Sequence, residues 1–513
     1  MSRAAALTLT VLAAAAAAAA CGGSSHPLGS VAQDPGPVPP PPDGGGPVLN
    51  LDGGIAILHP DGGVPASDGG VPATCATTIA ASDAPAADVV LHLAAGARVG
   101  STLGFTVPAG TASLTIVEQA VSAPAAITFQ GFAIENTAVP LLVTGPGGPT
   151  DVWFDDRQQP ASSPEAALAF FASSAPATGT LTIPNTTAAL NRGVLPQGSW
   201  SLVVGDLAYE CTVLSTNPCG TTGNTASTYD VTVIMKPAVS GAIPASGALD
   251  VTFHVVGTQT ASTAAPLPTS AAAAAADADV QRMVSTLKVI YAGAGVTVRE
   301  HFTDVPADVR ARYSGLVDVD SAGACAPLAQ LLATSGDGTS LHIFLVNGFT
   351  AAGLPPGTQI AGVDGTIPGP ATLGGTVASG AAVATDALRF GAAAGRCSGA
   401  PDYARCGDDL TAMVVAHEMG HFLGLYHVTE LTGLDFDPLS DTPACPCTTC
   451  RLASATDGAC NRNGTGHAMT TGECTVSTAC GGGDNLMFWF APGALGPLTA
   501  EQQRVVRANP QIR

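Results

Sequence analysis

The sequence predicts two folded parts: an all-β sandwich over residues 73–240 and a mixed α/β (α+β) domain over residues 247–513. The first prediction rests on short stretches of apolar and β-branched residues separated by Gly and Pro. The second rests on the order strand, helix, strand, strand and helix, which is typical of a mixed sheet covered by helices. With 513 residues, 46% of them hydrophobic, the chain is long enough for at least one sizeable core.

The charge balance excludes one class of partner. The formal net charge is -21, and only 18 residues are Lys or Arg. A nucleic-acid-binding protein needs a basic surface to neutralise phosphates, so no nucleic-acid partner is expected. The acidic balance suits a soluble outer surface and attracts divalent cations.

The N-terminus predicts export. Arg3 precedes an apolar run from Ala4 to Ala20, which is too short and too rich in Ala for a membrane span. Cys21 and a Gly-Gly-Ser-Ser tether follow. Residues 1–21 therefore resemble a bacterial lipoprotein signal, in which the Cys is lipidated and anchors the protein to the membrane. Ala18 departs from the usual Leu three places before the Cys, so plain secretion and a retained anchor are the alternatives.

Residues 22–72 have the composition of a linker. Pro35 to Pro42 are rich in Pro, and Asp-Gly-Gly repeats begin at Asp52, Asp61 and Asp68. Such segments carry little that could fill a core and stay extended.

The predicted sandwich contains several strand-like stretches. That over Leu195–Val204 resembles the penultimate strand of the pre-peptidase C-terminal β-sandwich found beside secreted bacterial peptidases. The stretches lie at 113–117, 126–129, 140–144, 151–154, 199–204 and 229–234.

The second part begins with a strand at 249–256. A helix is predicted over Ala271–Tyr291 from apolar residues at helical spacing, and strands follow at 296–298 and 341–346. His254 and His342 fall inside strands, where a packed or solvent-facing role is expected rather than metal binding.

The candidate metal ligands and the candidate catalytic residue lie in one segment, Ala416-His-Glu-Met-Gly-His-Phe-Leu-Gly-Leu-Tyr-His427. Thr411–Leu423 is predicted to be helical, so His417 and His421 project from one face and can bind a single zinc ion. Glu418 lies at the edge of that face, where it can act as the general base toward a water activated by the metal.

A third ligand requires the chain to turn back. Gly424 can adopt a positive φ and end the helix, which allows His427 to approach the same ion. The alternative is an amphipathic helix with incidental histidines. However, three of the 10 His in the chain lie within these residues, and the full pattern rarely occurs by chance.

This pattern resembles the metzincin zinc peptidases. In that family a turn containing a methionine lies beneath the metal. Asp484-Asn-Leu-Met-Phe-Trp489 fits its Asn-x-Met pattern, which makes Met487 the expected turn methionine. Met469 is the competing candidate.

Within the metzincins, three segments of this chain resemble sequences typical of the pappalysin family. They are the sequence from His421 to His427, the sequence Ser440-Asp-Thr-Pro443, and the closing helix expected over 498–507. The resemblance covers residues 247–513 and implies a zinc endopeptidase with a cleft between two subdomains. Members of that family also tend to bind a structural calcium ion, for which Asp435, Asp437 and Asp441 could offer oxygen ligands; a solvated acidic loop is the favoured interpretation of these residues.

One departure concerns residue 489. The family usually has Tyr two residues after the turn methionine, where its hydroxyl helps to stabilise the oxyanion. Here Trp489 has an N–H donor of different reach and no hydroxyl, so either a lower activity or another donor to the oxyanion is expected, while the zinc site is unaffected.

The chain has 13 Cys, nine of them from Cys325 onward, and export favours disulfides. Cys211 and Cys219 are expected to pair with each other, or one of them with Cys75; Cys397 is expected to pair with Cys406. For the cluster near the site, disulfides are favoured over a second zinc site: Cys445, Cys447, Cys450, Cys460, Cys474 and Cys480.

These observations predict a zinc-dependent endopeptidase that acts on a protein or peptide substrate at the cell surface, in the periplasm or after secretion. The alternative is a surface binding or adhesion lipoprotein with a weakly active or vestigial peptidase domain. A metzincin specialised for self-processing is a third possibility. Neither the substrate nor the need to remove a pro-region follows from the sequence.

Overall fold

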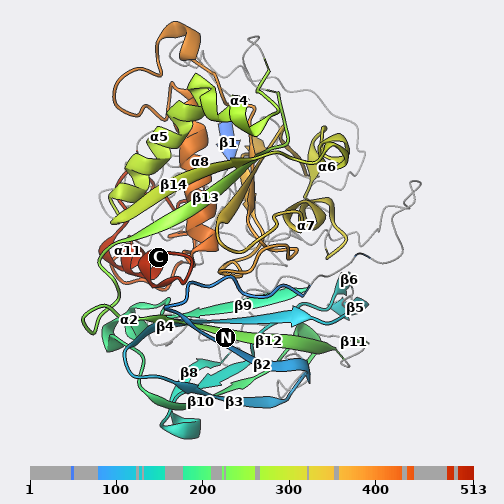
Figure 1. Ribbon diagram of the computed structural model, residues 1–513, viewed down its shortest axis with the longest axis vertical. Coiled ribbons are helices and arrows are strands. Elements are labelled where there is room, and N and C mark those ends of the chain that lie inside the picture. The colour runs from blue at the N-terminus through green and yellow to red at the C-terminus, as the bar shows by residue number, and fades with distance from the viewer. Residues whose placement is uncertain are drawn as a thin grey trace, which may run out of the picture.

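The computed structural model describes residues 48–50, 75, 79–122, 126–129, 132–155, 177–209, 222–223, 227–259, 266–319, 323–351, 358–429, 436–443, 482–489 and 495–513. Figure 1 shows two stacked parts: a β-rich part below and a mixed α/β part above. Both fold classes were predicted from the sequence. Across the described residues, none of the helices combines the length and apolar character that a membrane span requires.

The β-rich part contains two four-stranded antiparallel sheets, which together form the β-sandwich. The first has the order β2 (Val89–Arg98), β12 (Thr228–Pro237), β4 (Thr111–Ala120), β9 (Thr178–Ile183). The second has the order β3 (Thr102–Val107), β10 (Gly198–Val203), β7 (Leu142–Thr144), β8 (Val152–Asp155). Buried side chains from both sheets meet in one core, in which the rings of Trp153 and Trp200 lie 4.9 Å apart.

Smaller elements complete this part. They are a three-stranded sheet of β11 (Thr222–Gly223), β5 (Ala126–Phe129) and β6 (Phe132–Glu135), the 3-10 turn η1 (Gly148–Thr150), and the helix α2 (Thr187–Arg192).

Strand β4 is buried on both faces. Leu114 and Ile116 point into the sandwich core. The alternate residues face the α/β part: Val117 packs with Leu373, and the Ser113 hydroxyl donates to the carbonyl of Ala508. Because side chains alternate along a strand, one strand serves both the sandwich core and the interface.

The α/β part is built on a five-stranded sheet in the order β14 (Val296–Thr303), β13 (Gly247–Val255), β16 (Leu341–Val346), β20 (Ala381–Ala384), β19 (Gly362–Asp364). The first four strands are parallel, and the edge strand β19 is antiparallel. The prediction of a mixed sheet is confirmed.

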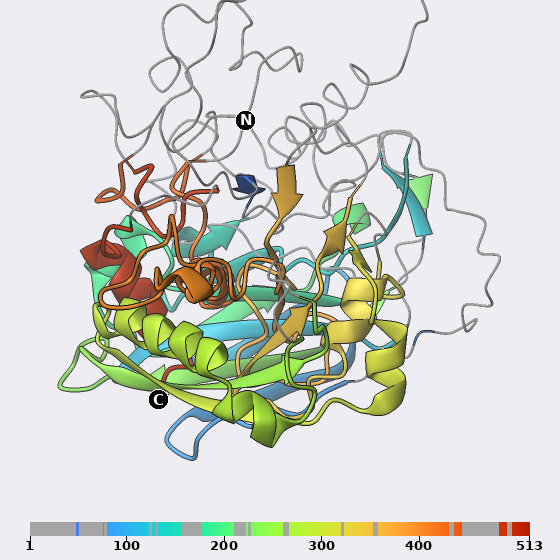
Figure 2. The ribbon, with the colours of Figure 1, turned by 90° about the horizontal axis from the view of Figure 1, so that it is seen from above.

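Helices cover both faces of this sheet. On one face, α5 (Ala278–Ala292) lies beside α8 (Gly407–Phe422), as Figure 2 shows from above; the Tyr291 hydroxyl donates to the Ala416 carbonyl at 2.9 Å. On the other face, α6 (Ala307–Arg312) and α7 (Pro327–Leu332) share a core with β16. Outside these layers are α11 (Ala500–Ala508), η4 (Ala392–Ala394), and the paired strands β15 (Val317–Asp318) and β17 (Phe349–Thr350).

The single helix predicted over 271–291 is divided in two, so that prediction is wrong in one detail. Helix α4 (Ala271–Ala276) ends at Asp277, whose backbone is extended. The Asp277 carboxylate accepts the N–H groups of Asp279 and Val280 and so begins α5 as its N-cap.

Part of the predicted linker is ordered. Strand β1 (Val48–Asn50) pairs in parallel with β18 (Thr358–Ile360); these three residues are extended, as expected, but their pairing with another strand was not predicted. Backbone pairing needs no particular side chain, which is why composition did not reveal it. The other residues of 22–72 lie outside the described part of the chain.

Two disulfides are present among the described residues. Cys397 bonds Cys406, as predicted, with Cα atoms 4.9 Å apart. Cys75 bonds Cys325, 250 positions away, so the predicted alternative of a bond from Cys75 to Cys211 or Cys219 is wrong. Their Cα atoms lie 5.4 Å apart, within the usual range for a disulfide, but only the tertiary structure brings them together.

Candidate metal centre

Helix α8 carries His417, Glu418 and His421 and is buried along nearly its whole length. Every residue in it except Leu410 is buried, and its apolar residues are not confined to one face. A helix that is apolar all round belongs in an interior, so its polar side chains are held in a dry environment. This position fixes the direction in which His417 and His421 point.

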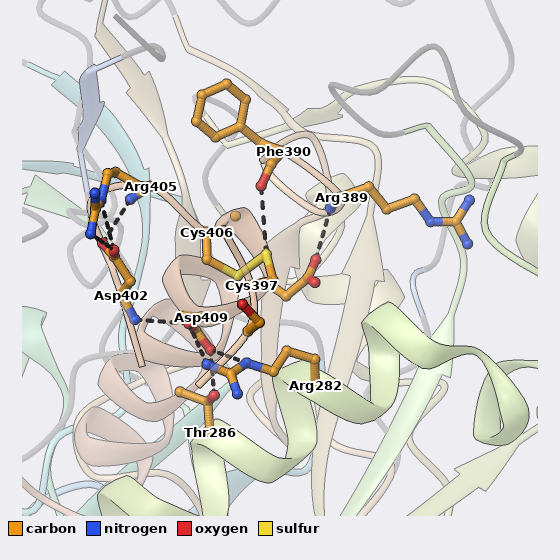
Figure 3. The surroundings of a disulfide bond; sticks show 12 residues. Arg282, Thr286, Arg389, Phe390, Cys397, Asp402, Arg405, Cys406 and Asp409 are labelled. Atoms are coloured by element: carbon orange, nitrogen blue, oxygen red, sulfur yellow. Dashed lines mark hydrogen bonds and ion pairs between the residues drawn. A yellow bond between two sulfur atoms is a disulfide. The ribbon is translucent and has the colours of Figure 1, made fainter. Parts of the chain in front are cut away.

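The first turn of α8 is anchored to α5 and to a disulfide loop (Figure 3). Arg282 donates from two nitrogens, at 2.8 Å each, to the two carboxylate oxygens of buried Asp409, and Thr286 donates to the same carboxylate at 2.5 Å. Cys406, bonded to Cys397, stands directly before the helix. Carboxylates also favour the positive end of a helix.

Three imidazoles converge at the other end of α8. The Nε2 atoms of His417 and His421 are 3.0 Å apart, those of His421 and His427 3.1 Å, and those of His417 and His427 3.2 Å. All three side chains are buried. Three imidazole nitrogens this close together could act as the three protein ligands of one ion, and a catalytic zinc site uses three protein ligands of this kind.

The hydrogen bonds of the outer ring nitrogens define the protonation of two of these rings. Nδ1 of His417 donates to the carbonyl of Leu486 at 2.6 Å, and Nδ1 of His421 donates to that of Leu425 at 2.8 Å. A neutral imidazole with its proton on Nδ1 has a lone pair on Nε2. The two Nε2 lone pairs of His417 and His421 therefore lie in one small space, 3.0 Å apart, and their mutual repulsion would be relieved by a cation that both rings bind.

The electrostatics of the site keep the rings of His417 and His421 neutral. Burial, together with the neighbouring His427, lowers the pKa of His417 to about 3. Burial and the two neighbouring rings lower the pKa of His421 well below its ordinary value. Neutral imidazole is the form that binds a metal ion.

The turn after α8 brings in the third histidine. Gly424 has φ +104°, a backbone conformation that residues with a side chain rarely adopt. Its N–H donates to the carbonyl of His421, and the N–H of Leu425 donates to that of Gly420. The helix ends at Phe422, and the chain turns back so that His427 reaches the other two rings.

Glu418 lies next to this site and beside the edge strand β19. Its side chain is fully buried. Strand β19 contributes Gly362, and a Cβ atom built there would lie 2.5 Å from Oε1 of Glu418. The absence of a side chain at 362 gives the carboxylate its space.

The segment over 485–489 forms a turn beneath the histidines. Met487 is buried, and its Sδ would lie 2.5 Å from a Cβ atom at Gly420, between the two helical histidines. Asn485 and Gln502 of α11 exchange two amide hydrogen bonds, at 3.0 and 3.1 Å. Asn485 also accepts the N–H of Met487 at 2.8 Å, so α11 holds this turn in place. Trp489 is buried and packs beside Phe488.

The structure adds residues that sequence reasoning missed. Besides Gly362, it places the buried carboxyl of Asp364, at the end of β19, near His427. Burial raises the pKa of Asp364 to about 7, while the electrostatic effect of His427 acts in the opposite direction. Nothing in the local sequence marks this residue, because it approaches the site through the sheet.

The two strand histidines, for which no metal role was expected, and the proposed calcium ligands have different surroundings. His254 and His342 hydrogen-bond each other at 2.9 Å. Two of the proposed calcium ligands serve the fold: Asp437 is buried and accepts from Thr442, and Asp441 accepts from the hydroxyl of Thr499 and the N–H of Glu501, both at 2.8 Å, at the start of α11. Burial raises the pKa of Asp437 to about 8. Outside the described residues lie Cys21, Asp435, Met469 and the cysteines from Cys445 to Cys480.

The donor set fits zinc. The described residues include one group of three buried histidines whose ligand atoms converge. Three imidazole nitrogens with a free fourth position and a nearby carboxylate are typical of a catalytic zinc site. The carbonyls of Leu486 and Leu425 supply the outer hydrogen bonds that orient ligand histidines.

No protein-family model and no curated protein matches the chain. One solved structure that does match, the YxiM protein of Bacillus subtilis, is 13% identical over 48% of this chain and 46% of that chain, with a TM-score of 0.12. The chain thus spans less than half of that protein, and a likeness of this size carries no argument about fold or function.

Proposed function

We propose that this protein is a zinc-dependent endopeptidase of the metzincin type, similar to the pappalysins, that hydrolyses peptide bonds of a protein or peptide substrate. The observation that carries the proposal is the approach of three Nε2 atoms to within 3.0–3.2 Å of one another, with the carboxylate of Glu418 one residue from the first ligand. His417, His421 and His427 would hold the ion.

When bound, zinc supplies Lewis acidity toward a water molecule and the scissile carbonyl. Glu418 takes the proton from that water as general base and then delivers it to the leaving amine as general acid. Its burial strengthens these interactions, because a dry site screens charge less than water does. The carbonyls of Leu486 and Leu425 hold two ligand rings in the tautomer that offers Nε2.

Residue 489 limits the analogy with the family. A Tyr hydroxyl at this place would donate to the developing oxyanion, whereas Trp489 has only an indole N–H. Preorganised donors of this kind typically contribute about 10²–10³ in rate. Slower turnover than in Tyr-containing relatives is therefore part of the proposal.

The second candidate is an adhesion or binding lipoprotein in which the β-sandwich does the work, and Trp489 is the observation that favours it. Against this candidate, one face of the sheet formed by β2, β12, β4 and β9 is covered by the α/β part through Val117, Ile234 and Leu373, so this face is not open to a binding partner.

We also propose that the protein is exported and anchored through a lipid on Cys21.

The test uses the full chain on casein, with zinc content measured by elemental analysis. Wild type should contain one zinc per chain and cleave casein, and 1,10-phenanthroline should stop the cleavage. Glu418→Ala should retain zinc and lose cleavage. The matched control is Glu300→Ala, which removes a partly exposed glutamate paired with Lys288 and should cleave like wild type. A pure Glu418→Ala preparation that still cleaves, or native protein without a transition metal, would overturn the assignment; bound zinc without cleavage would favour the adhesion protein.

A further inference from the structure

One buried cation joins the β-sandwich to the α/β part. Lys236 is one of only two lysines in the chain, the other being Lys288, and it lies near the end of β12 with 6% of its surface exposed. Its Nζ donates to the backbone carbonyls of Arg507 at 2.7 Å, Asn509 at 3.1 Å and Ile512 at 2.5 Å. All three acceptors belong to the end of α11 or to the segment that follows it.

The hydrogen bonds from Lys236 satisfy backbone carbonyls at the C-terminal end of α11. The last carbonyls of a helix have no partner within the helix, and they form the negative end of its dipole. An ammonium group has three N–H donors and a positive charge, which matches three acceptors in this position. Ser113 of β4 donates to the intervening carbonyl of Ala508. In Figure 1, α11 lies where the two parts of the molecule meet.

The surrounding charges are few. Burial lowers the pKa of Lys236 to about 8, the carboxylate of Asp88 favours the charged form, and Arg507 opposes it. Asp88 in turn interacts with Arg513. Beside the attraction of this carboxylate, the three carbonyls give the buried ammonium a hydrogen-bond acceptor for each of its N–H groups.

From α11, two routes of hydrogen bonds reach the metal ligands. Gln502 holds Asn485, which binds the N–H of Met487, and the carbonyl of the intervening Leu486 accepts from Nδ1 of His417. The side chain of Asn509 reaches the carbonyl of Phe422, next to His421, at 3.5 Å. Lys236 thus fixes the helix that supports both the methionine-containing turn and the end of α8.

We propose that Lys236, although it belongs to the β-sandwich, is a positioning residue for the metal centre. The proposal rests on the metal site of the proposed function but not on its peptidase activity. It makes the β-sandwich part of the working unit rather than a removable pro-region or an independent module. Coupling of this kind is reciprocal: if Lys236 orders the site, metal binding must in turn order Lys236.

The first experiment uses this reciprocity in the wild-type full chain. Amines are labelled with isotopic acetic anhydride with zinc bound, after zinc removal by 1,10-phenanthroline, and after zinc is restored, and both lysines are followed by mass spectrometry. Lys236 should label at least about 5-fold faster without zinc, the lower end of typical coupling. Lys288, which is 41% exposed, is the internal control and should not change. Equal labelling of Lys236 with and without zinc would overturn the proposal.

The second experiment compares Lys236→Met with Lys288→Met by titration with Co²⁺, reading the visible spectrum of the bound ion at a temperature where circular dichroism shows both variants folded. Lys236→Met should bind about 10-fold more weakly, the lower end of the effect of losing an outer-shell partner, with an altered spectrum. Lys288→Met should match wild type. A purely structural lysine would lower the melting temperature of Lys236→Met but leave the affinity and spectrum unchanged, and that result would refute the positioning role.

The two proposals fail in different ways. Zinc bound without casein cleavage defeats the peptidase but leaves the labelling and titration experiments decisive for Lys236. Cleavage with unchanged labelling and unchanged Co²⁺ affinity defeats the positioning role alone. If Lys236→Met does not fold, the labelling of wild type decides.

Discussion

Gly362 of β19 lies directly against the carboxylate of Glu418, so that a Cβ atom on residue 362 would approach Oε1 to 2.5 Å and the carboxyl carbon to 2.8 Å. Real Cβ atoms do not tolerate such contacts, so either the strand or the carboxylate would have to move. The edge of the sheet thereby sets the position of the proposed general base, although the two residues are far apart in the sequence.

Gly362→Ala should therefore lower casein cleavage by about 100-fold, the typical effect of a displacement near 1 Å in a catalytic group. The zinc content should stay at that of wild type, because residue 362 is not among the ligands. Gly315→Ala is the matched control, since no atom lies within 4 Å of its Cβ position. Full activity of Gly362→Ala, or loss of zinc together with activity, would contradict this account.

The close packing of Met487 against Gly420 predicts that a larger residue at position 420 destabilises the fold. Ala is about 1 kcal/mol better than Gly within a helix, yet a Cβ at residue 420 would lie 2.5 Å from Sδ of Met487. Overpacking of this kind costs about 1–3 kcal/mol, so Gly420→Ala should lower the free energy of unfolding measured by urea denaturation.

Met487→Leu conserves volume and should cost less than about 1.5 kcal/mol. If Gly420→Ala proved more stable than wild type, the methionine would not be packed against α8 as described.

The ion pair at the start of α8 should stabilise the fold strongly. Arg282→Met leaves Asp409, which is fully buried, without its cation, and breaking such a pair costs about 3–5 kcal/mol. Arg299→Met is the control, because the Arg299 side chain is 52% exposed in its pair with Asp250, and exposed pairs contribute about 0–1 kcal/mol. Urea denaturation of both variants measures the difference. Equal losses would show that the Arg282 pair contributes no more than a surface contact.

Asp408 should make stability depend on pH. Burial, assisted by the neighbouring Asp279, Asp409 and Asp277, raises its pKa from 3.8 to about 7, against the opposing hydrogen bond from the N–H of Arg389. A carboxyl whose pKa is higher in the folded than in the unfolded state contributes stability that is complete below pH 3.8 and is lost as the pH rises through 7.

Asp408→Asn cannot ionise, so its free energy of unfolding should rise relative to that of wild type between pH 4 and pH 8. Urea denaturation of both proteins across this range measures the difference. A difference that is constant with pH, or that changes in the other direction, would show that Asp408 ionises normally in the folded protein.

The sequence was most informative where the relevant residues are close along the chain. The four-residue spacing of His417 and His421, the glycine at 424 and the return of His427 all lie within eleven consecutive residues, so helix geometry and the freedom of one glycine are enough to predict that the rings approach one another. Alternation of apolar residues likewise predicted most strands of the sandwich and the mixed character of the second sheet. The sequence did not predict the break at Asp277, because an Asp within a helical pattern is usually a surface residue. Its role as an N-cap is evident only from its hydrogen bonds to the backbone N–H groups of α5.

Only the tertiary structure decided what surrounds the candidate site. The carbonyl of Leu486 that orients His417, the space that Gly362 leaves for Glu418, and the contact of Lys236 with the end of α11 join segments 69, 56 and more than 270 positions apart. Backbone carbonyls and missing side chains have no signature in composition or periodicity. Their roles depend on which strand lies against which helix end. This arrangement is determined by the packing of the β-sandwich core and the α/β core together, and not by the local preference of any segment.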